Sequence, residues 1–109
     1  MNLTLLGSTG SIGVSTLDVV SRHPDRYKIW ALTAYQQVDL MLQQCQQFKP
    51  ERVVMVQAQA AQTLRSRLAQ LGMHHIEVMD GWRALDEVAQ APQVDAVMAA
   101  IVGAAGLSP

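Results

Sequence analysis

The sequence predicts an α/β fold in which a doubly wound parallel sheet carries helices on both faces. Short β-rich runs alternate with longer segments of helical periodicity, and strands joined by helices pair in parallel through right-handed crossovers. Of the 109 residues, 50% are hydrophobic, which is enough for a core and excludes a disordered chain. A glycine-rich turn follows the first strand directly. Because no internal repeat or linker-like segment interrupts the pattern, residues 1–109 are expected to form one domain.

Two strands and two helices are predicted in the first half of the chain. Residues 3–6 form a continuous apolar run, typical of a strand buried on both faces, and residues 27–33 form the next strand. A helix begins at Ser11 and ends before Pro24. Its predicted inner stripe consists of Ile12, Thr16, Val19, Val20 and His23. The second helix ends at Lys49-Pro50, and its predicted inner stripe consists of Val38, Met41, Cys45 and Phe48.

The second half continues the alternation. Residues 52–56, 76–79 and 96–102 are the predicted third, fourth and fifth strands, of which the fourth is the weakest. The third helix is closed by Gly72, and its predicted inner residues are Ala61, Leu64, Leu68 and Leu71. A short helix follows Asp80-Gly81 and ends at Ala91-Pro92, with Trp82, Leu85 and Ala89 predicted inward.

Charge and cysteine content narrow the class of protein. The formal net charge of −1 gives no bulk attraction to nucleic acid or to an anionic membrane. No apolar stretch approaches the roughly 18 to 20 residues of a membrane helix, and no secretion leader precedes the first strand. A single cysteine, Cys45, forms no internal disulfide and is expected to be a buried small hydrophobe. A cytoplasmic protein is therefore expected. The adjacent His74 and His75 would point to opposite faces of a strand, which disfavours a shared metal.

The glycine-rich turn is the motif that carries chemistry. Gly7-Ser8-Thr9-Gly10-Ser11-Ile12-Gly13 lies between the first strand and the first helix. In this position glycines permit a tight turn and a close approach to a pyrophosphate, while the helix N-terminus offers free N–H groups and a positive dipole. Ser8, Thr9 and Ser11 add hydroxyl donors. The turn predicts a nucleotide-binding, Rossmann-like domain, and an empty turn is the structural alternative.

The end of the second strand indicates which nucleotide is bound. NAD sites hold the ribose 2′-hydroxyl with a carboxylate there, whereas NADP sites need donors for a 2′-phosphate. The segment Tyr35-Gln36-Gln37 contains no carboxylate, which speaks against ordinary NAD use, and no Lys or Arg. Gln36 and Gln37 are predicted donors to the phosphate and Tyr35 a stacking partner for adenine; a solvent-facing polar loop is the alternative.

Two long motifs resemble a known family. Leu-Gly-Ser-Thr-Gly-Ser-Ile-Gly at residues 6–13, followed by Ser-Thr-Leu-Asp-Val-Val at residues 15–20, is similar to the N-terminal NADPH-binding domain of the 1-deoxy-D-xylulose 5-phosphate reductoisomerase family. Met-Ala-Ala-Ile-Val-Gly-Ala-Ala-Gly-Leu at residues 98–107 carries the same resemblance. Together with the element order, the resemblance spans the whole chain.

The resemblance implies an enzyme that isomerises 1-deoxy-D-xylulose 5-phosphate and reduces the product with NADPH to 2-C-methyl-D-erythritol 4-phosphate, for isoprenoid synthesis. It implies a divalent metal, Mg²⁺, Mn²⁺ or Co²⁺, with ligands outside this chain, and a homodimer. It also implies that Thr9, Gly10, Ser11 and Ile12 line the pyrophosphate and that the loop at residues 100–106, beginning at Ala100, passes close to the cofactor.

One departure from the family pattern is visible within the chain. The family has Gly-Lys-Asn or Gly-Arg-Asn where this chain has Tyr35-Gln36-Gln37. Ser108-Pro109 is typical of a helix start, so the chain is expected to be the front part of a longer polypeptide, and no catalytic residue is assigned within it. The alternatives are another NADP-dependent reductase, of the semialdehyde or acyl-phosphate type, and a stand-alone nucleotide-sensing module.

Overall fold

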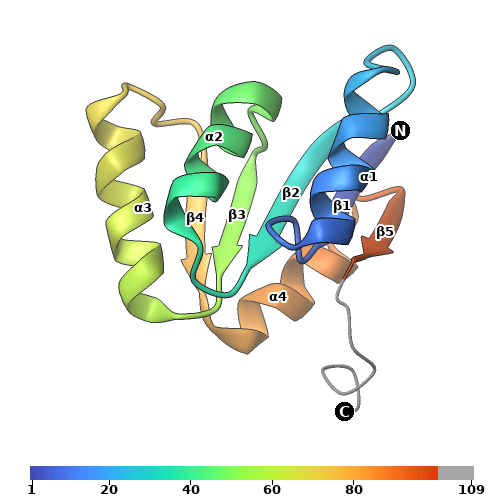
Figure 1. Cartoon of the computed structure of the whole chain (residues 1–109). Coiled ribbons are helices and arrows are strands. Elements are labelled where there is room, and N and C mark those ends of the chain that lie inside the picture. Colours follow the sequence, from blue (N-terminus) through green and yellow to red (C-terminus); the bar gives the residue numbers. More distant parts are fainter. Residues whose placement is uncertain (101–109) are drawn as a thin grey trace.

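The computed structural model describes residues 1–100 and, within them, alternates five strands with four helices (Figure 1). The strands are Asn2–Leu6 (β1), Lys28–Ala34 (β2), Arg52–Met55 (β3), Glu77–Asp80 (β4) and Ala96–Ala99 (β5). The helices are Ser11–Ser21 (α1), Val38–Phe48 (α2), Ala58–Gln70 (α3) and Gly81–Gln90 (α4). All of the elements expected from the sequence are present in the expected order. Residues 101 and 102 of the predicted fifth strand, and the predicted helix start at Ser108, lie outside the described residues.

All strand pairs of the sheet are parallel, in the order β4-β3-β2-β1-β5. The chain moves outward from β1 to β4 and then returns to the other side of β1 to add β5. This reversal makes the gap between the carboxyl ends of β1 and β5 the topological switch point, where open α/β sheets bind their ligands. The doubly wound α/β fold predicted from the sequence is confirmed.

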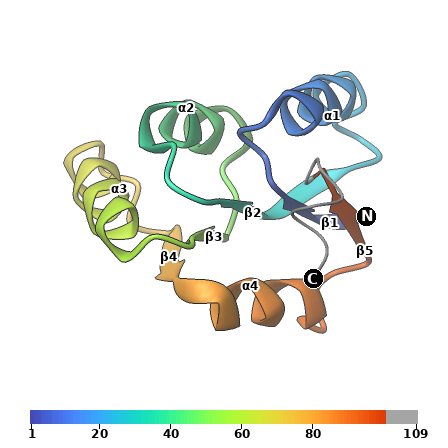
Figure 2. The ribbon, with the colours of Figure 1, turned by 60° about the horizontal axis from the view of Figure 1, so that its bottom comes forward.

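Helices cover both faces of the sheet, but unequally. Figure 2 shows α1, α2 and α3 on one face and α4 alone on the other. The larger core packs residues of α1, α2 and α3 against the sheet, with Leu5 and Leu32 almost fully buried at its centre. The smaller core beneath α4 consists of Trp30, Ala31, Val54, Ala84 and Val88. Both faces of the central strands β2 and β3 are therefore apolar, as continuous hydrophobic runs require.

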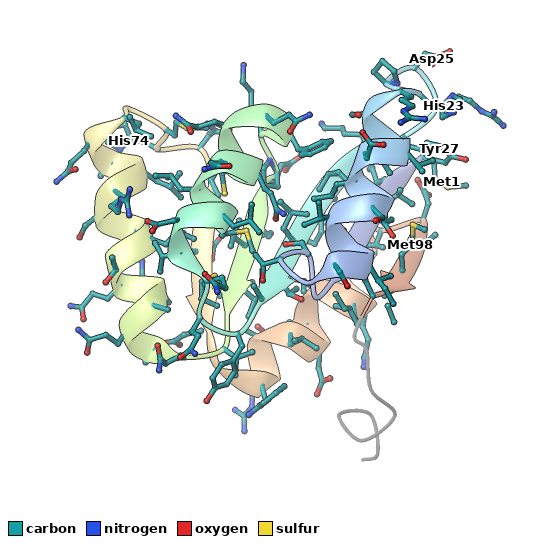
Figure 3. The ribbon with its side chains drawn as sticks, viewed as in Figure 1. Met1, His23, Asp25, Tyr27, His74 and Met98 are labelled. Carbon is teal, nitrogen blue, oxygen red and sulfur yellow. The ribbon has the colours of Figure 1, made fainter. Side chains whose placement is uncertain are left out.

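The predicted inner face of α1 is wrong at most of its positions, although Val20 is buried as predicted. Ile12 and Val19 are 49% and 52% exposed, and the buried residues of the helix are Gly13, Leu17 and Val20. The helix contacts the glycine turn through Gly13, so one position of its buried face contributes no hydrophobic side chain. His23, also placed on the inner stripe, is exposed beyond the end of α1, where its ring meets the edge of Tyr27 with 6.3 Å between centroids (Figure 3).

The other helices agree with their predicted faces to different degrees. In α2, Met41 and Cys45 are fully buried, as predicted. In α3, Ala61, Leu64 and Leu68 are buried as predicted, but Leu71 follows the last turn and is 48% exposed. In α4 the buried residues are Ala84 and Val88, so the inward prediction for Trp82 is wrong: this indole is 66% exposed.

Within residues 1–100, no helix combines the length and the apolar character needed to span a bilayer.

Candidate functional site

The glycine-rich turn joins the carboxyl end of β1 to the start of α1. Gly7 has a φ of 81°, a left-handed conformation that favours glycine. The N–H groups of Gly7 and Ser8 both donate to the carbonyl oxygen of Thr33, at 3.1 and 2.8 Å, and the Gly7 N–H also reaches Thr33 Oγ1 at 3.1 Å. These bonds attach the turn to the end of β2, so its first half is fixed before any ligand is bound.

Gly13 allows α1 to pack against this turn. A Cβ atom added at Gly13 would lie 2.2 Å from the Gly7 carbonyl oxygen and 2.7 Å from Ser8 Cα. Both atoms belong to the backbone, so neither moves without moving the turn itself. The third glycine of the motif therefore has a structural cause, the close contact of helix and turn, which is the role that such a glycine has in dinucleotide-binding domains.

The second half of the turn presents backbone donors. The first backbone N–H of α1 with a partner is that of Val14, which donates to Gly10 O at 2.9 Å. Among residues 1–100, no acceptor receives the N–H groups of Thr9, Gly10, Ser11 or Ile12, and no side chain caps the helix. Free N–H groups at a helix N-terminus with its positive dipole form an anion-binding site. The predicted pyrophosphate site thus has the donors that a dinucleotide requires.

Ser8 has a different place from the one predicted. Its side chain is fully buried, and its hydroxyl donates to Oε1 of Gln44 at 2.7 Å, so it does not face a ligand as an added donor. Gln44 in turn donates from Nε2 to the Ser8 carbonyl oxygen at 2.8 Å. The sequence reasoning missed Gln44 because no local pattern connects residues 36 positions apart. Its position on the inner side of α2, beside Cys45, was the only available signal.

A cleft of about 280 Å³ opens at the carboxyl ends of the central strands. Its walls are the glycine turn, the end of β2, Val56 after β3, the first turns of α4 and Ala100 after β5. The residues that line it are Gly7, Gly10, Thr33, Ala34, Tyr35, Val56, Trp82, Leu85 and Ala100. Because it lies at the switch point beside the free N–H groups, the cleft continues the anion site into an apolar space.

Two aromatic rings stand at the mouth of the cleft. Tyr35 and Trp82 have centroids 6.4 Å apart and planes tilted by 35°. They are 55% and 66% exposed, and they come from the loop after β2 and from the first turn of α4. Large exposed rings beside an apolar cleft offer flat surfaces on which a planar heterocycle can stack. Trp82 was missed as a site residue because its apolar character favoured a place in the core.

The remaining predicted residues lie near these walls. Gln36 and Gln37 are exposed and follow Tyr35 in the loop between β2 and α2. Ala100 is buried, and its N–H donates to the Leu6 carbonyl oxygen at 2.8 Å, which holds the chain beside the glycine turn as it leaves β5. The rest of the predicted cofactor loop, residues 101–106, lies outside the described residues.

Two further features of the described residues are the Cys45 thiol and the arrangement of potential metal ligands. Cys45 is fully buried, and burial raises the pKa of its thiol to about 12, so it remains protonated at neutral pH. The interpretation of Cys45 as a small hydrophobe is consistent with this environment. In residues 1–100, no three His, Cys, Asp or Glu side chains gather closely enough to hold a metal ion.

A parallel sheet with this strand order, whose first turn offers free N–H groups to an anion, defines a dinucleotide-binding α/β domain of the Rossmann type. Comparison of the sequence with protein families assigns it further. Residues 3–109 match the 1-deoxy-D-xylulose 5-phosphate reductoisomerase family, and the chain belongs to that family.

Individual relatives agree with this family assignment. The chain is 54% identical over 107 residues to the 1-deoxy-D-xylulose 5-phosphate reductoisomerase of Methylococcus capsulatus, and 56% identical over 108 residues to that of Dechloromonas aromatica. The matches cover 98% and 99% of this chain but 27% of each relative. The chain therefore spans about a quarter of the length of these relatives.

Solved structures show the same domain. The crystal structure of a DOX-P reductoisomerase in complex with NADPH, fosmidomycin and magnesium superposes with a TM-score of 0.90 at 39% identity, over 98% of this chain and 26% of that one. The reductoisomerase of Zymomonas mobilis in complex with NADPH gives a TM-score of 0.84 at 39% identity, over 97% of this chain and 27% of that one.

Proposed function

We propose that this chain is the NADPH-binding domain, residues 1–109, of an enzyme that isomerises 1-deoxy-D-xylulose 5-phosphate and reduces it to 2-C-methyl-D-erythritol 4-phosphate. One observation carries the proposal: the family match over residues 3–109 includes the glycine turn whose N–H groups are free at the switch point. Family membership also favours this activity over reductases of the semialdehyde or acyl-phosphate type.

The chemistry of the walls supports a position for each part of the cofactor. The pyrophosphate accepts hydrogen bonds from the N–H groups of the turn, at Thr9, Gly10, Ser11 and Ile12, close to Gly7 and Ser8. The adenine lies in the apolar cleft against Tyr35 and Trp82. Gln36 and Gln37 donate neutral hydrogen bonds to the 2′-phosphate, and Ala100 borders the cofactor beside the turn.

The rest of the enzyme lies beyond this chain. Relatives solved with magnesium and with fosmidomycin support a divalent metal and a phosphorylated sugar substrate in the whole protein. We assign the metal ligands and the catalytic residues to parts outside residues 1–109, and none to this chain. When bound, NADPH would supply the hydride for the reduction. We also propose that the whole enzyme is a homodimer and is cytoplasmic.

A calorimetric titration of the purified chain tests the cofactor assignment. NADPH and NADH are added separately at one fixed salt concentration, since phosphate contacts are screened by salt. Tighter binding of NADPH than of NADH is the expected result, with the 2′-phosphate recognised by neutral donors. Equal binding would contradict NADPH selectivity, and no binding of either nucleotide would contradict the assignment of the cofactor site to this chain.

The activity of the whole protein needs a separate test. Oxidation of NADPH in the presence of 1-deoxy-D-xylulose 5-phosphate and magnesium is followed for the full-length protein. Turnover with this substrate and none with semialdehydes supports the proposed reaction. Cofactor binding without turnover of 1-deoxy-D-xylulose 5-phosphate would favour the nucleotide-sensing alternative.

A further inference from the structure

We infer that Gln44 is a positioning residue for the cofactor: by holding the carbonyl group of Ser8, it sets the direction in which the Thr9 N–H points toward the pyrophosphate. The inference rests on the proposed function, because it concerns the same turn. Gln44 lies on α2, far from the motif in sequence, and its side chain has no route of its own to the ligand, being 5% exposed.

The contact between the two residues is a reciprocal pair of hydrogen bonds. Ser8 Oγ donates to Gln44 Oε1 at 2.7 Å, and Gln44 Nε2 donates to the Ser8 carbonyl oxygen at 2.8 Å. Both side chains are buried, Ser8 fully, so water does not compete for these groups. A buried pair that uses both the donor and the acceptor of one amide fixes the partner more closely than a single bond.

The peptide plane converts this contact into the orientation of a donor. The Ser8 carbonyl and the Thr9 N–H belong to one trans peptide group, so they point in opposite directions. Gln44 holds the carbonyl toward α2, and the Thr9 N–H therefore points away from α2. No acceptor among residues 1–100 receives that N–H, which leaves it available to an anion. On the other side of the residue, the Ser8 N–H donates to Thr33 O at 2.8 Å.

Loss of Gln44 would leave the Ser8–Thr9 peptide plane without a hydrogen bond from residues 1–100, because the Ser8 N–H that donates to Thr33 belongs to the preceding peptide plane. The Ser8 hydroxyl has a second neighbour, Met41 Sδ at 3.9 Å, a weak acceptor to which it can turn. The Ser8 carbonyl has no such replacement among its contacts in residues 1–100. A free carbonyl can rotate toward the anion and repel it, so the N–H that binds the pyrophosphate would be replaced by an acceptor for part of the time.

The position requires an amide. Methionine matches glutamine in length but can neither donate a hydrogen bond nor accept one well, and glutamate accepts from the Ser8 hydroxyl but cannot donate to its carbonyl. Gln44→Met therefore removes the contact with little change in volume. Gln46→Met is the matched control, because Gln46 is exposed on the same helix.

The experiment measures dissociation constants of NADPH and NADH for this chain, with the Gln44→Met, Ser8→Ala and doubly substituted variants. Titrations are run at a temperature where circular dichroism shows every variant folded, so that a loss of stability alone does not change the affinity. Gln44→Met is expected to weaken both nucleotides about tenfold, because both carry the pyrophosphate. Adding Ser8→Ala is expected to cost nothing further, as for residues acting in one contact.

The outcomes separate the inference from the proposed function. If the unsubstituted chain binds neither nucleotide, the proposed function fails. Binding by the unsubstituted chain with an unchanged dissociation constant in folded Gln44→Met overturns the inference alone. A variant that melts at lower temperature but binds normally would assign Gln44 a structural role only. An equal loss in Gln46→Met would also count against the inference.

Discussion

Substituting alanine for Gly13 perturbs the closest contact between α1 and the glycine turn. The added Cβ would lie 2.2 Å from the Gly7 carbonyl oxygen, whereas ordinary contacts begin at 3.4 Å, so helix and turn must separate by 1.2 Å, the difference of the two. Overpacking of this kind costs about 1–3 kcal/mol, and the better helix propensity of alanine returns about 1 kcal/mol. The free energy of unfolding is therefore expected to fall by at most about 2 kcal/mol.

The affinity for NADPH is expected to fall together with the stability. A hydrogen bond to a charged group contributes about 1.5–3 kcal/mol, so NADPH is expected to bind Gly13→Ala between about tenfold and 100-fold more weakly than the unsubstituted chain. Calorimetry gives the dissociation constant, and urea unfolding gives the stability. Ser15→Ala, exposed on the same helix, is the control for helix propensity. Normal NADPH binding by a folded Gly13→Ala variant would refute the reasoning.

Three further predictions concern the walls of the cleft and the core. Gln36→Lys is expected to tighten NADPH binding about tenfold, because a cation contacts the 2′-phosphate more strongly than an amide does, and to leave NADH unchanged in the same titration; equal effects on both would contradict it. Trp82→Ala is expected to weaken both nucleotides about tenfold through lost stacking on adenine, with an unchanged melting temperature because the indole is 66% exposed; Arg83→Ala, exposed beside it, should bind normally. Burial raises the pKa of Cys45 from 9.0 to about 12, so the folded state keeps a proton that the unfolded state loses. The contribution of this thiol to the free energy of unfolding is fully present below pH 9.0 and is lost as the pH rises to about 12. The free energy of unfolding, measured with urea across this range, should decline less for Cys45→Ala than for the unsubstituted chain, and identical curves would contradict the prediction.

The fold could be predicted because its signals are local. Each strand is a short apolar run and each helix has a stop, such as Pro24 or Gly72, so the alternation is readable without knowledge of contacts. The face of α1 could not be read in the same way. Periodicity counts hydrophobic side chains, and this helix is closest to its neighbour at Gly13, where a side chain would collide. In α4 the small Ala84 packs inward while Trp82 is exposed.

The residues of the candidate site likewise divide into those with a local sequence signal and those positioned by long-range contacts. Its backbone donors at residues 9–12 were predicted because a glycine turn after a strand is a local motif with a known geometry. The partners that hold the turn, Thr33 and Gln44, come from other elements and lie 26 and 36 positions from it. Trp82 enters the cleft only because α4 crosses beneath the ends of the central strands. Long-range packing decides such residues.

The strand order also sets when the cleft is completed during folding. β1 pairs with β2 at Asn2↔Lys28, which are close in sequence. The other edge of β1 is paired only when β5 docks, and there the Asn2 N–H donates to the Asp95 carboxylate across 93 positions. Closing the longer loop costs about 1 kcal/mol more chain entropy than closing the shorter one, so β5 joins the sheet late. Ala100 forms its wall of the cleft only through β5. A chain emerging from the ribosome thus acquires the glycine turn long before Ala100 joins the wall of the pocket, and nucleotide binding would report the docking of β5.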